Sequence, residues 1–245
     1  SEVRLGQQIT VFQQHDTGSF DKLITQSPTM QQTIDEAKRI ADLDAPILIF
    51  GETGTGKEML AKACHQSSRR ADKPFLALNC GAIPDNVAET ELFGYAAGTF
   101  NQTQAKVGLI EQAAGGTLLL DEIADMSTQL QAKLLRVLED GEFRRIGDVN
   151  PVGVDVRFIC TTCQDLGQLV EEGKFRKELY YRLNVLGLVV PSLRERRSDI
   201  VPLSEAFILQ HSAKLGRRPA KLSKSCVDFL QHYPWPGNVR QLQNA

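Results

Sequence analysis

Residues 51–58 read GETGTGKE and lie between a short apolar run, APILIF at 45–50, and a helical pattern that begins at Lys57. A strand, a glycine-rich turn and a helix N-terminus in this order bring unpaired backbone N–H groups around one point, which suits a phosphate group. The glycines permit a tight turn, and the lysine reaches toward β- and γ-phosphates. The residues predicted to bind nucleotide are Gly51, Glu52, Thr53, Gly54, Thr55, Gly56, Lys57 and Glu58.

A second motif, GGTLLLDEI at 115–123, ends an apolar run in two acids, Asp121 and Glu122. A phosphate-binding sheet needs groups that hold a metal ion and activate water at this point. We therefore predict that Asp121 binds Mg²⁺, directly or through water, and that Glu122 polarises the attacking water. Together with the glycine-rich loop, this pair predicts an ATP and Mg²⁺ site.

Three arginines complete the candidate site. Arg176 and Arg182 belong to GKFRKELYYRLNV, and arginines neutralise the charge that spreads over a transferring phosphoryl group, often from a neighbouring subunit. The same spacing also fits a solvated basic helix face. Arg240 stands in the Trp-Pro-Gly turn of WPGNVRQL and by itself indicates no function.

The composition limits the function classes. The chain has 245 residues, of which 42% are apolar, and a formal net charge of −2. This charge balance argues against binding of nucleic acid through the chain's overall field. The five cysteines are scattered through apolar runs, which indicates reduced thiols, and the C-x-x-C pair Cys160 and Cys163 has no second pair or nearby His to form a metal site. No signal peptide or bilayer-spanning run is present, so we expect a cytoplasmic protein without membrane contact.

Short apolar runs alternate with helical patterns, which is typical of a parallel sheet buried on both faces. The five strands are predicted at 45–50, 75–80, 117–121, 156–161 and 186–190. A helix is predicted from Pro28, with Ser27 as its N-cap. We predict a linker or the tail of a preceding domain at 1–27, an α/β core at 28–191 and a small helical domain at 192–245.

The chain resembles the central AAA+ ATPase domain of bacterial enhancer-binding transcription regulators over about residues 24–245. The resemblance rests on segments such as GETGTGKE, ETELFGYAAGTF, GGTLLLDEI, FRKELYYRLNVL, PSLRERRSDI and WPGNVRQL. It implies a P-loop NTPase with a five-stranded parallel sheet in an αβα core, a helical lid, nucleotide between the two, and ring assemblies, usually hexamers. Glu at position 58 is common in this family.

The resemblance also implies roles for single residues. Lys57 matches the phosphate-binding lysine, and Asp121 and Glu122 match the pair that serves Mg²⁺ and water. Asn79 matches the partner of the switch glutamate, and Arg240 the lid sensor. Arg176 and Arg182 match the arginine fingers that act on the neighbouring subunit's nucleotide.

Two positions depart from the family pattern. Members that remodel RNA polymerase carrying sigma-54 have a GAFTGA loop, and residues 98–103 read GTFNQT here, with Asn101 and Gln102 in place of the threonine and the second glycine. The first sensor, usually Asn, is Cys163, and a thiol is a poor substitute for an amide that orients water. ATP binding should survive both changes because the glycine loop is intact, and the functions that the changes affect are rapid hydrolysis and sigma-54 remodelling.

This combination resembles the tyrosine-responsive, TyrR-type branch of the family. It implies ATP-dependent binding of tyrosine, assembly from dimers to hexamers, and repression or activation of genes for aromatic amino acid synthesis and transport. A sigma-54-dependent ATPase and a general AAA+ chaperone or clamp-loader module remain alternatives, and whether ATP is hydrolysed or only bound stays open. The chain ends within a helical pattern, which suggests a fragment of a longer protein. The resemblance implies DNA contact through a helix-turn-helix beyond residue 245, and contact with RNA polymerase in the full-length protein.

Overall fold

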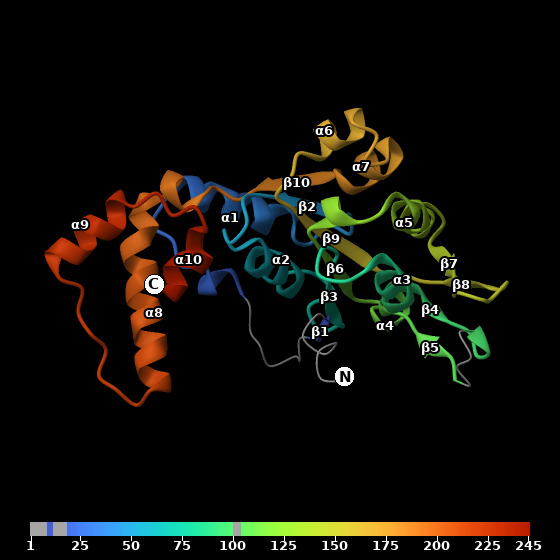
Figure 1. Cartoon of the computed structure of the whole chain (residues 1–245), viewed down its shortest axis with the longest axis horizontal. Coiled ribbons are helices and arrows are strands. Elements are labelled where there is room, and N and C mark those ends of the chain that lie inside the picture. Colours follow the sequence, from blue (N-terminus) through green and yellow to red (C-terminus); the bar gives the residue numbers. More distant parts are fainter. Residues whose placement is uncertain (1–8, 12–18, 100–103) are drawn as a thin grey trace.

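The computed structural model describes residues 9–11, 19–99 and 104–245 and centres on a six-stranded sheet (Figure 1). Five strands run parallel in the order β3-β6-β9-β2-β10, and β1 joins the β3 edge antiparallel. Their bounds are β1 (Ile9–Val11), β2 (Ile47–Phe50), β3 (Phe75–Asn79), β6 (Thr117–Asp121), β9 (Arg157–Thr162) and β10 (Leu186–Val189). The five parallel strands were predicted from the apolar runs, and the α/β fold is confirmed.

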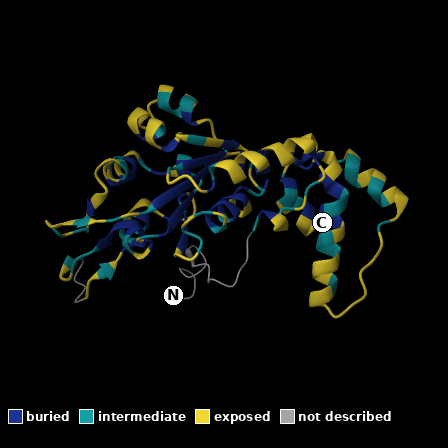
Figure 2. Cartoon of the chain, turned by 180° about the vertical axis from the view of Figure 1, so that it is seen from behind, coloured by how far each residue is buried: buried dark blue, intermediate teal, exposed yellow. Residues whose placement is uncertain are grey.

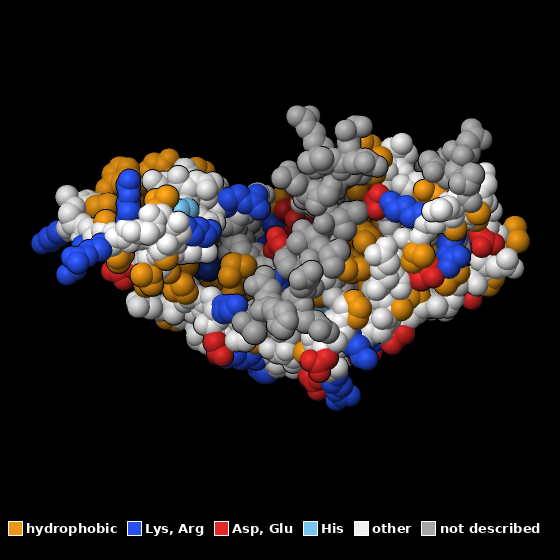
Figure 3. All heavy atoms as spheres, turned by 90° about the horizontal axis from the view of Figure 1, so that it is seen from below, with side chains coloured by type: hydrophobic (Ala, Val, Ile, Leu, Met, Phe, Trp, Pro, Cys, Tyr) orange, Lys and Arg blue, Asp and Glu red, His pale blue; other side chains and the backbone are white. Residues whose placement is uncertain are grey.

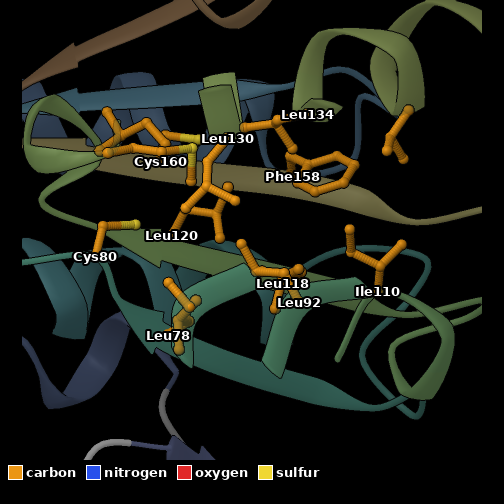
Figure 4. Close-up of a cluster of buried hydrophobic side chains, with 14 of the residues drawn as sticks. Leu78, Cys80, Leu92, Ile110, Leu118, Leu120, Leu130, Leu134, Phe158 and Cys160 are labelled. Atoms are coloured by element: carbon orange, nitrogen blue, oxygen red, sulfur yellow. The ribbon is translucent and has the colours of Figure 1, made fainter. Parts of the chain in front are cut away.

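Helices cover both faces of the sheet, because alternate residues of each buried strand point to opposite sides. One face packs against α1 (Pro28–Ile40) and α2 (Lys57–Gln66) through strand residues such as Ile49 and Leu119. The other packs through residues such as Leu118, Leu120 and Phe158 (Figure 4). Its covering helices are α3 (Asp85–Phe93), α4 (Leu109–Gln112), α5 (Thr128–Asp140), α6 (Leu166–Glu171) and α7 (Lys177–Leu183).

Two small antiparallel pairs extend from the end of the core opposite the helical domain (Figure 1). They are β4 (Gly94–Tyr95) with β5 (Lys106–Val107), and β7 (Glu142–Arg144) with β8 (Pro151–Gly153). The substituted residues Asn101 and Gln102 of the GTFNQT segment lie between β4 and β5, at 100–103, outside the described residues.

The helical domain has its own small core. It comprises η5 (Leu193–Glu195), η6 (Arg197–Asp199), α8 (Ile200–Lys214), α9 (Lys224–His232) and α10 (Asn238–Asn244). Trp235, Leu242 and Leu203 are buried in it, whereas the far end of α8 and most of α9 are exposed (Figure 2). Lys and Arg side chains project at this end of the molecule, where the connection between α8 and α9 carries exposed Arg217 and Arg218 (Figure 3).

Residues 1–27 contain more structure than the predicted linker. Ile9–Val11 form β1, and η2 (Phe20–Lys22) places Phe20 in the cluster shared by α1 and α2. Three strand residues among polar neighbours are too few to show an alternation, and the open edge of β3 supplies the pairing. No helix in the described part of the chain is long and apolar enough to span a membrane.

Candidate functional site

The phosphate-binding loop, residues 51–58, connects the end of β2 to the start of α2. Gly54 and Gly56 have φ values of 79° and 103°, which only glycine adopts without strain. A Cβ at Gly54 would lie 2.5 Å from the carbonyl oxygen of Gly237, so the loop and the start of α10 approach too closely for a side chain. α2 begins at Lys57 directly after the loop, and the first N–H groups of a helix have no partner within the helix.

Lys57 is buried and already engages the acid predicted to activate water. Its Nζ lies 2.8 Å from the Gly51 carbonyl oxygen and 3.1 Å from Glu122 Oε1. Lys57 is 6% exposed, so this ion pair is largely withdrawn from solvent. A nucleotide phosphate at the loop would compete with Glu122 for the ammonium group and free the carboxylate for a water molecule.

Asp121 and Glu122 end β6 at the carboxyl edge of the parallel sheet, where neighbouring strands place further polar groups. Asp121 accepts hydrogen bonds from Asn79 Nδ2 at 2.9 Å and from Thr161 Oγ1 at 2.5 Å. Glu122 has a left-handed φ of 53°, and its Oε2 accepts from the Cys163 N–H at 3.0 Å. In this state Asn79 therefore holds Asp121, not Glu122, and its role as switch partner stays a prediction.

These side chains line a cavity of about 570 Å³ between core and helical domain. The predicted residues that line it are Thr53, Gly54, Gly56, Lys57, Glu58, Asn79, Asp121, Glu122 and Arg240. Gly51, Glu52 and Thr55 belong to the same loop and do not contribute to the lining. Nine residues from four separate segments thus meet in one place, and the volume suits a nucleotide-sized ligand.

The cavity is electrostatically prepared for a cation beside a phosphate. The pKa of Glu58 is raised, mainly by burial and next by the neighbouring Asp121 carboxylate. A Mg²⁺ bound beside these two carboxylates would offset the effect of the Asp121 charge on Glu58. Among the described residues no group of three or more His, Cys, Asp or Glu is arranged to hold a metal unaided. Mg²⁺ that also binds phosphate oxygens needs only one or two carboxylates, so these residues fit the ion.

The two finger candidates lie elsewhere. Arg176 is the N-cap of α7 and donates from Nε to the Thr128 carbonyl oxygen at 3.2 Å. Arg182 is 54% exposed, with Nε 3.8 Å from Glu139 Oε1. Neither lines the cavity of its own chain. This placement is compatible with action on a neighbouring subunit, which stays a prediction.

Several cavity residues had no sequence signal or only a weak one. Asp125 and Gln243 line it, and Thr161 orients Asp121 from the strand beside it. The contact between Thr161 and Asp121 follows from the sheet order, because β9 lies next to β6 and both strands end at the same edge. Cys163 also lines the cavity, whereas Cys160 is fully buried in the core, so the C-x-x-C pair is not one site.

The comparison with protein families decides the classification. A family model described as the sigma-54 interaction domain matches residues 23–189, and one described as the AAA+ ATPase lid domain matches residues 194–245. The chain belongs to the sigma-54 interaction domain family of AAA+ proteins. The predicted P-loop NTPase core with a helical lid is thereby confirmed.

Curated relatives place the chain near the TyrR-type branch, as the motifs predicted. The HTH-type transcriptional regulatory protein TyrR of Enterobacter agglomerans is 51% identical over 246 residues, covering 100% of this chain and 47% of that protein. TyrR of Haemophilus influenzae is 48% identical, covering 92% and 70%. The Nif-specific regulatory protein of Azotobacter vinelandii is 46% identical, covering 93% and 44%. The chain spans about half the length of the first curated relatives it matches.

Solved structures agree with this classification. NtrX from Brucella abortus, in a crystal structure with ATP, is 42% identical and superposes with a TM-score of 0.85, covering 91% of this chain and 49% of that one. The NtrX complex with ADP gives the same TM-score of 0.85.

Proposed function

We propose that this chain is the ATP-binding domain of a TyrR-type transcription regulator. The observation that carries the proposal is the convergence of the phosphate-binding loop, the Asp121–Glu122 pair and Arg240 around one cavity. ATP would lie with its phosphates against the loop N–H groups and Lys57. Mg²⁺ would be held by Asp121 together with phosphate oxygens, and when bound it supplies charge neutralisation. The ATP complex of NtrX supports this assignment.

The finer part of the proposal is that ATP licenses the binding of tyrosine, which in turn drives assembly from dimers to hexamers. A ligand that binds one assembly state more tightly shifts the population toward that state. The sequence identity of about half between this chain and TyrR proteins supports this proposal. In the full-length protein, a DNA-binding domain outside this chain and RNA polymerase would complete the repression or activation of genes for aromatic amino acid synthesis and transport.

A second cavity, of about 430 Å³, supports binding of an amino acid. Its lining includes the buried rings of Phe93 and Phe143, whose centroids lie 5.9 Å apart. Arg136 and Arg144 also line it, and within the described part of the chain neither forms an ion pair. Together with the Glu142 carboxylate, these groups would match the carboxylate, the ammonium group and the ring of an aromatic amino acid.

The test is equilibrium dialysis of labelled tyrosine against this chain, with and without a non-hydrolysable ATP analogue. Analytical ultracentrifugation of the same samples reports assembly. We expect tyrosine binding that appears with the analogue and is accompanied by a larger species. Binding of the analogue without binding of tyrosine would refute the effector role and leave ATP binding intact. An Arg136→Ala variant that binds tyrosine as tightly as the wild type would refute the second cavity as the tyrosine site.

A sigma-54-dependent ATPase is the second candidate. The family model and the Nif-specific relative favour it. In family members that remodel the polymerase, the loop threonine contacts the sigma factor and the second glycine acts as a hinge. This chain has Asn101 and Gln102 at these two positions, which counts against the second candidate. Rapid phosphate release from ATP, combined with loss of remodelling on Phe100→Ala, would favour this candidate over the first.

A further inference from the structure

The outer side of the phosphate-binding loop is held by the helical domain. Buried backbone carbonyl groups need hydrogen-bond donors, and three carbonyls of the loop find theirs in the segment after the last strand. Thr53 O accepts from Asn238 Nδ2 at 3.1 Å, and Gly54 O accepts from the Arg240 N–H at 3.2 Å. Thr55 O accepts from Arg196 at 2.5 Å. Three successive loop carbonyls are therefore satisfied by the segment that follows the last strand.

Glu52 makes the same connection through its side chain. Its carboxylate accepts hydrogen bonds from both terminal nitrogens of Arg194, one of them at 2.8 Å, and from Asn238 Nδ2 at 3.0 Å. The hydrogen bonds from Arg194 and then Asn238 lower the pKa of Glu52 to about 2, so the carboxylate is ionised throughout the ordinary pH range. Glu52 does not line the cavity, and the partners of its carboxylate are in the helical domain. Its predicted contact with nucleotide stays a prediction.

Asn238 is the centre of this connection. It is fully buried, has a left-handed φ of 51° and stands at the start of α10. Its Oδ1 accepts from the Leu193 N–H at 2.8 Å while Nδ2 donates to Thr53 O and Glu52. An unfavourable backbone conformation at a buried residue persists only where the surroundings impose it. A single amide side chain thus joins the loop, η5 and α10.

We propose that Glu52, Arg194, Arg196 and Asn238 are positioning residues that keep the phosphate-binding loop in its anion-receptive shape. Their side chains would set nucleotide affinity without touching nucleotide, and any movement of the helical domain would reach the phosphates through them. The inference rests on the proposed binding of ATP or ADP to this site. It assigns a role in phosphate affinity to four residues outside the cavity lining.

The experiment is a double-mutant cycle on the Kd for ADP, measured by titration calorimetry with the 245-residue chain. Glu52→Gln and Arg194→Gln should each raise Kd about two- to fivefold, a modest effect because both side chains are more than 40% exposed. The double variant should raise Kd no more than the larger single change, because both remove the same contact. Asn238→Ala should raise Kd about tenfold, since it leaves buried partners unsatisfied.

Arg197→Gln is the matched control, because Arg197 is an exposed arginine three residues from Arg194 with no ion pair in the described residues. It should leave Kd unchanged. Hydrogen exchange gives a second readout: amides of the loop and of α10 should exchange faster in Glu52→Gln, while those of β3 and β6 should not change. If Asn238→Ala fails to fold, the Glu52 and Arg194 variants still carry the test.

The outcomes separate two failures. A wild-type chain that binds no ADP refutes the proposed nucleotide site. A wild-type chain that binds ADP, with single variants that bind equally well or a double variant whose effects multiply, overturns the positioning role. A raised Kd in Arg197→Gln as large as that in Arg194→Gln would also overturn it, because the effect would then follow from surface charge alone.

Discussion

Replacement of Asp199 by alanine should strongly destabilise the junction between core and helical domain. Asp199 is fully buried, and its carboxylate accepts from the N–H groups of Gln26 at 2.6 Å and Ser27 at 2.9 Å. It also accepts from Thr25 Oγ1 at 2.9 Å and lies 3.9 Å from the buried guanidinium of Arg196. The substitution orphans these donors and leaves the Arg196 charge without a counter-charge.

The expected loss follows from these contacts. Removal of one partner of a buried charge pair costs about 3–5 kcal/mol, and each orphaned buried donor costs about 1–3 kcal/mol before water enters. We therefore expect a loss of about 3–5 kcal/mol in the free energy of unfolding. For a chain of this size that corresponds to a decrease in Tm of roughly 6–20 °C. Asp199→Asn should lose less, because its amide oxygen still accepts the two backbone N–H groups.

Urea unfolding followed by circular dichroism measures this loss, with scanning calorimetry as a second probe. Asp228→Ala is the control, since Asp228 is exposed on α9 and should change stability by less than about 0.5 kcal/mol. A loss below about 1 kcal/mol for Asp199→Ala would refute the reasoning. It would mean that water replaces the carboxylate at little cost, and that residues 25–27 are not anchored through Asp199.

Three further predictions concern pH and the nucleotide site. Burial lowers the pKa of His65 to about 4, below the ordinary 6.5, so the unfolded chain binds more protons between these values and stability should fall by roughly 2–3 kcal/mol as pH drops from 6.5 to 4. Urea unfolding at several pH values checks this, and His65→Gln, which retains a polar contact to Thr117, should show a smaller decrease. Lys57→Ala should raise the Kd for ATP about 10- to 100-fold, measured by titration with a fluorescent analogue, and unchanged affinity would exclude the loop as the phosphate site. Arg176→Ala and Arg182→Ala should leave the ATP affinity of the dilute chain within about twofold, because neither lines its cavity, and a tenfold loss in the same titration would contradict their placement.

Much of the fold could be predicted because its signals are local. The strands β2, β3, β6 and β9 are continuous apolar runs that contribute to the cores on both faces of the sheet, so the pattern needs no knowledge of its neighbours. The start of α1 at Pro28 after Ser27 follows from capping chemistry within one turn. The phosphate-binding loop is likewise contained in eight consecutive residues, whose glycines allow the tight turn.

The partners of the site residues could not be predicted in this way. Asn79 donates to Asp121 across 42 residues, and Arg194 reaches Glu52 across 142. The motif predicts nucleotide contact for Glu52 but does not indicate that its carboxylate turns to the helical domain. A side chain in a tight loop has two sides available, and its own sequence neighbours do not determine which side another segment will occupy.

The amino-acid sequence therefore determined which elements form and which chemical groups stand at their ends, since propensity, capping and apolar periodicity act over a few residues. The tertiary structure decided which of these groups meet. The strand order β3-β6-β9-β2-β10 brings Asn79, Asp121 and Thr161 to one edge, and the packing of α10 on Gly54 closes the cavity from outside. These contacts arise from the burial of a shared core, a sum over distant segments that no local pattern contains.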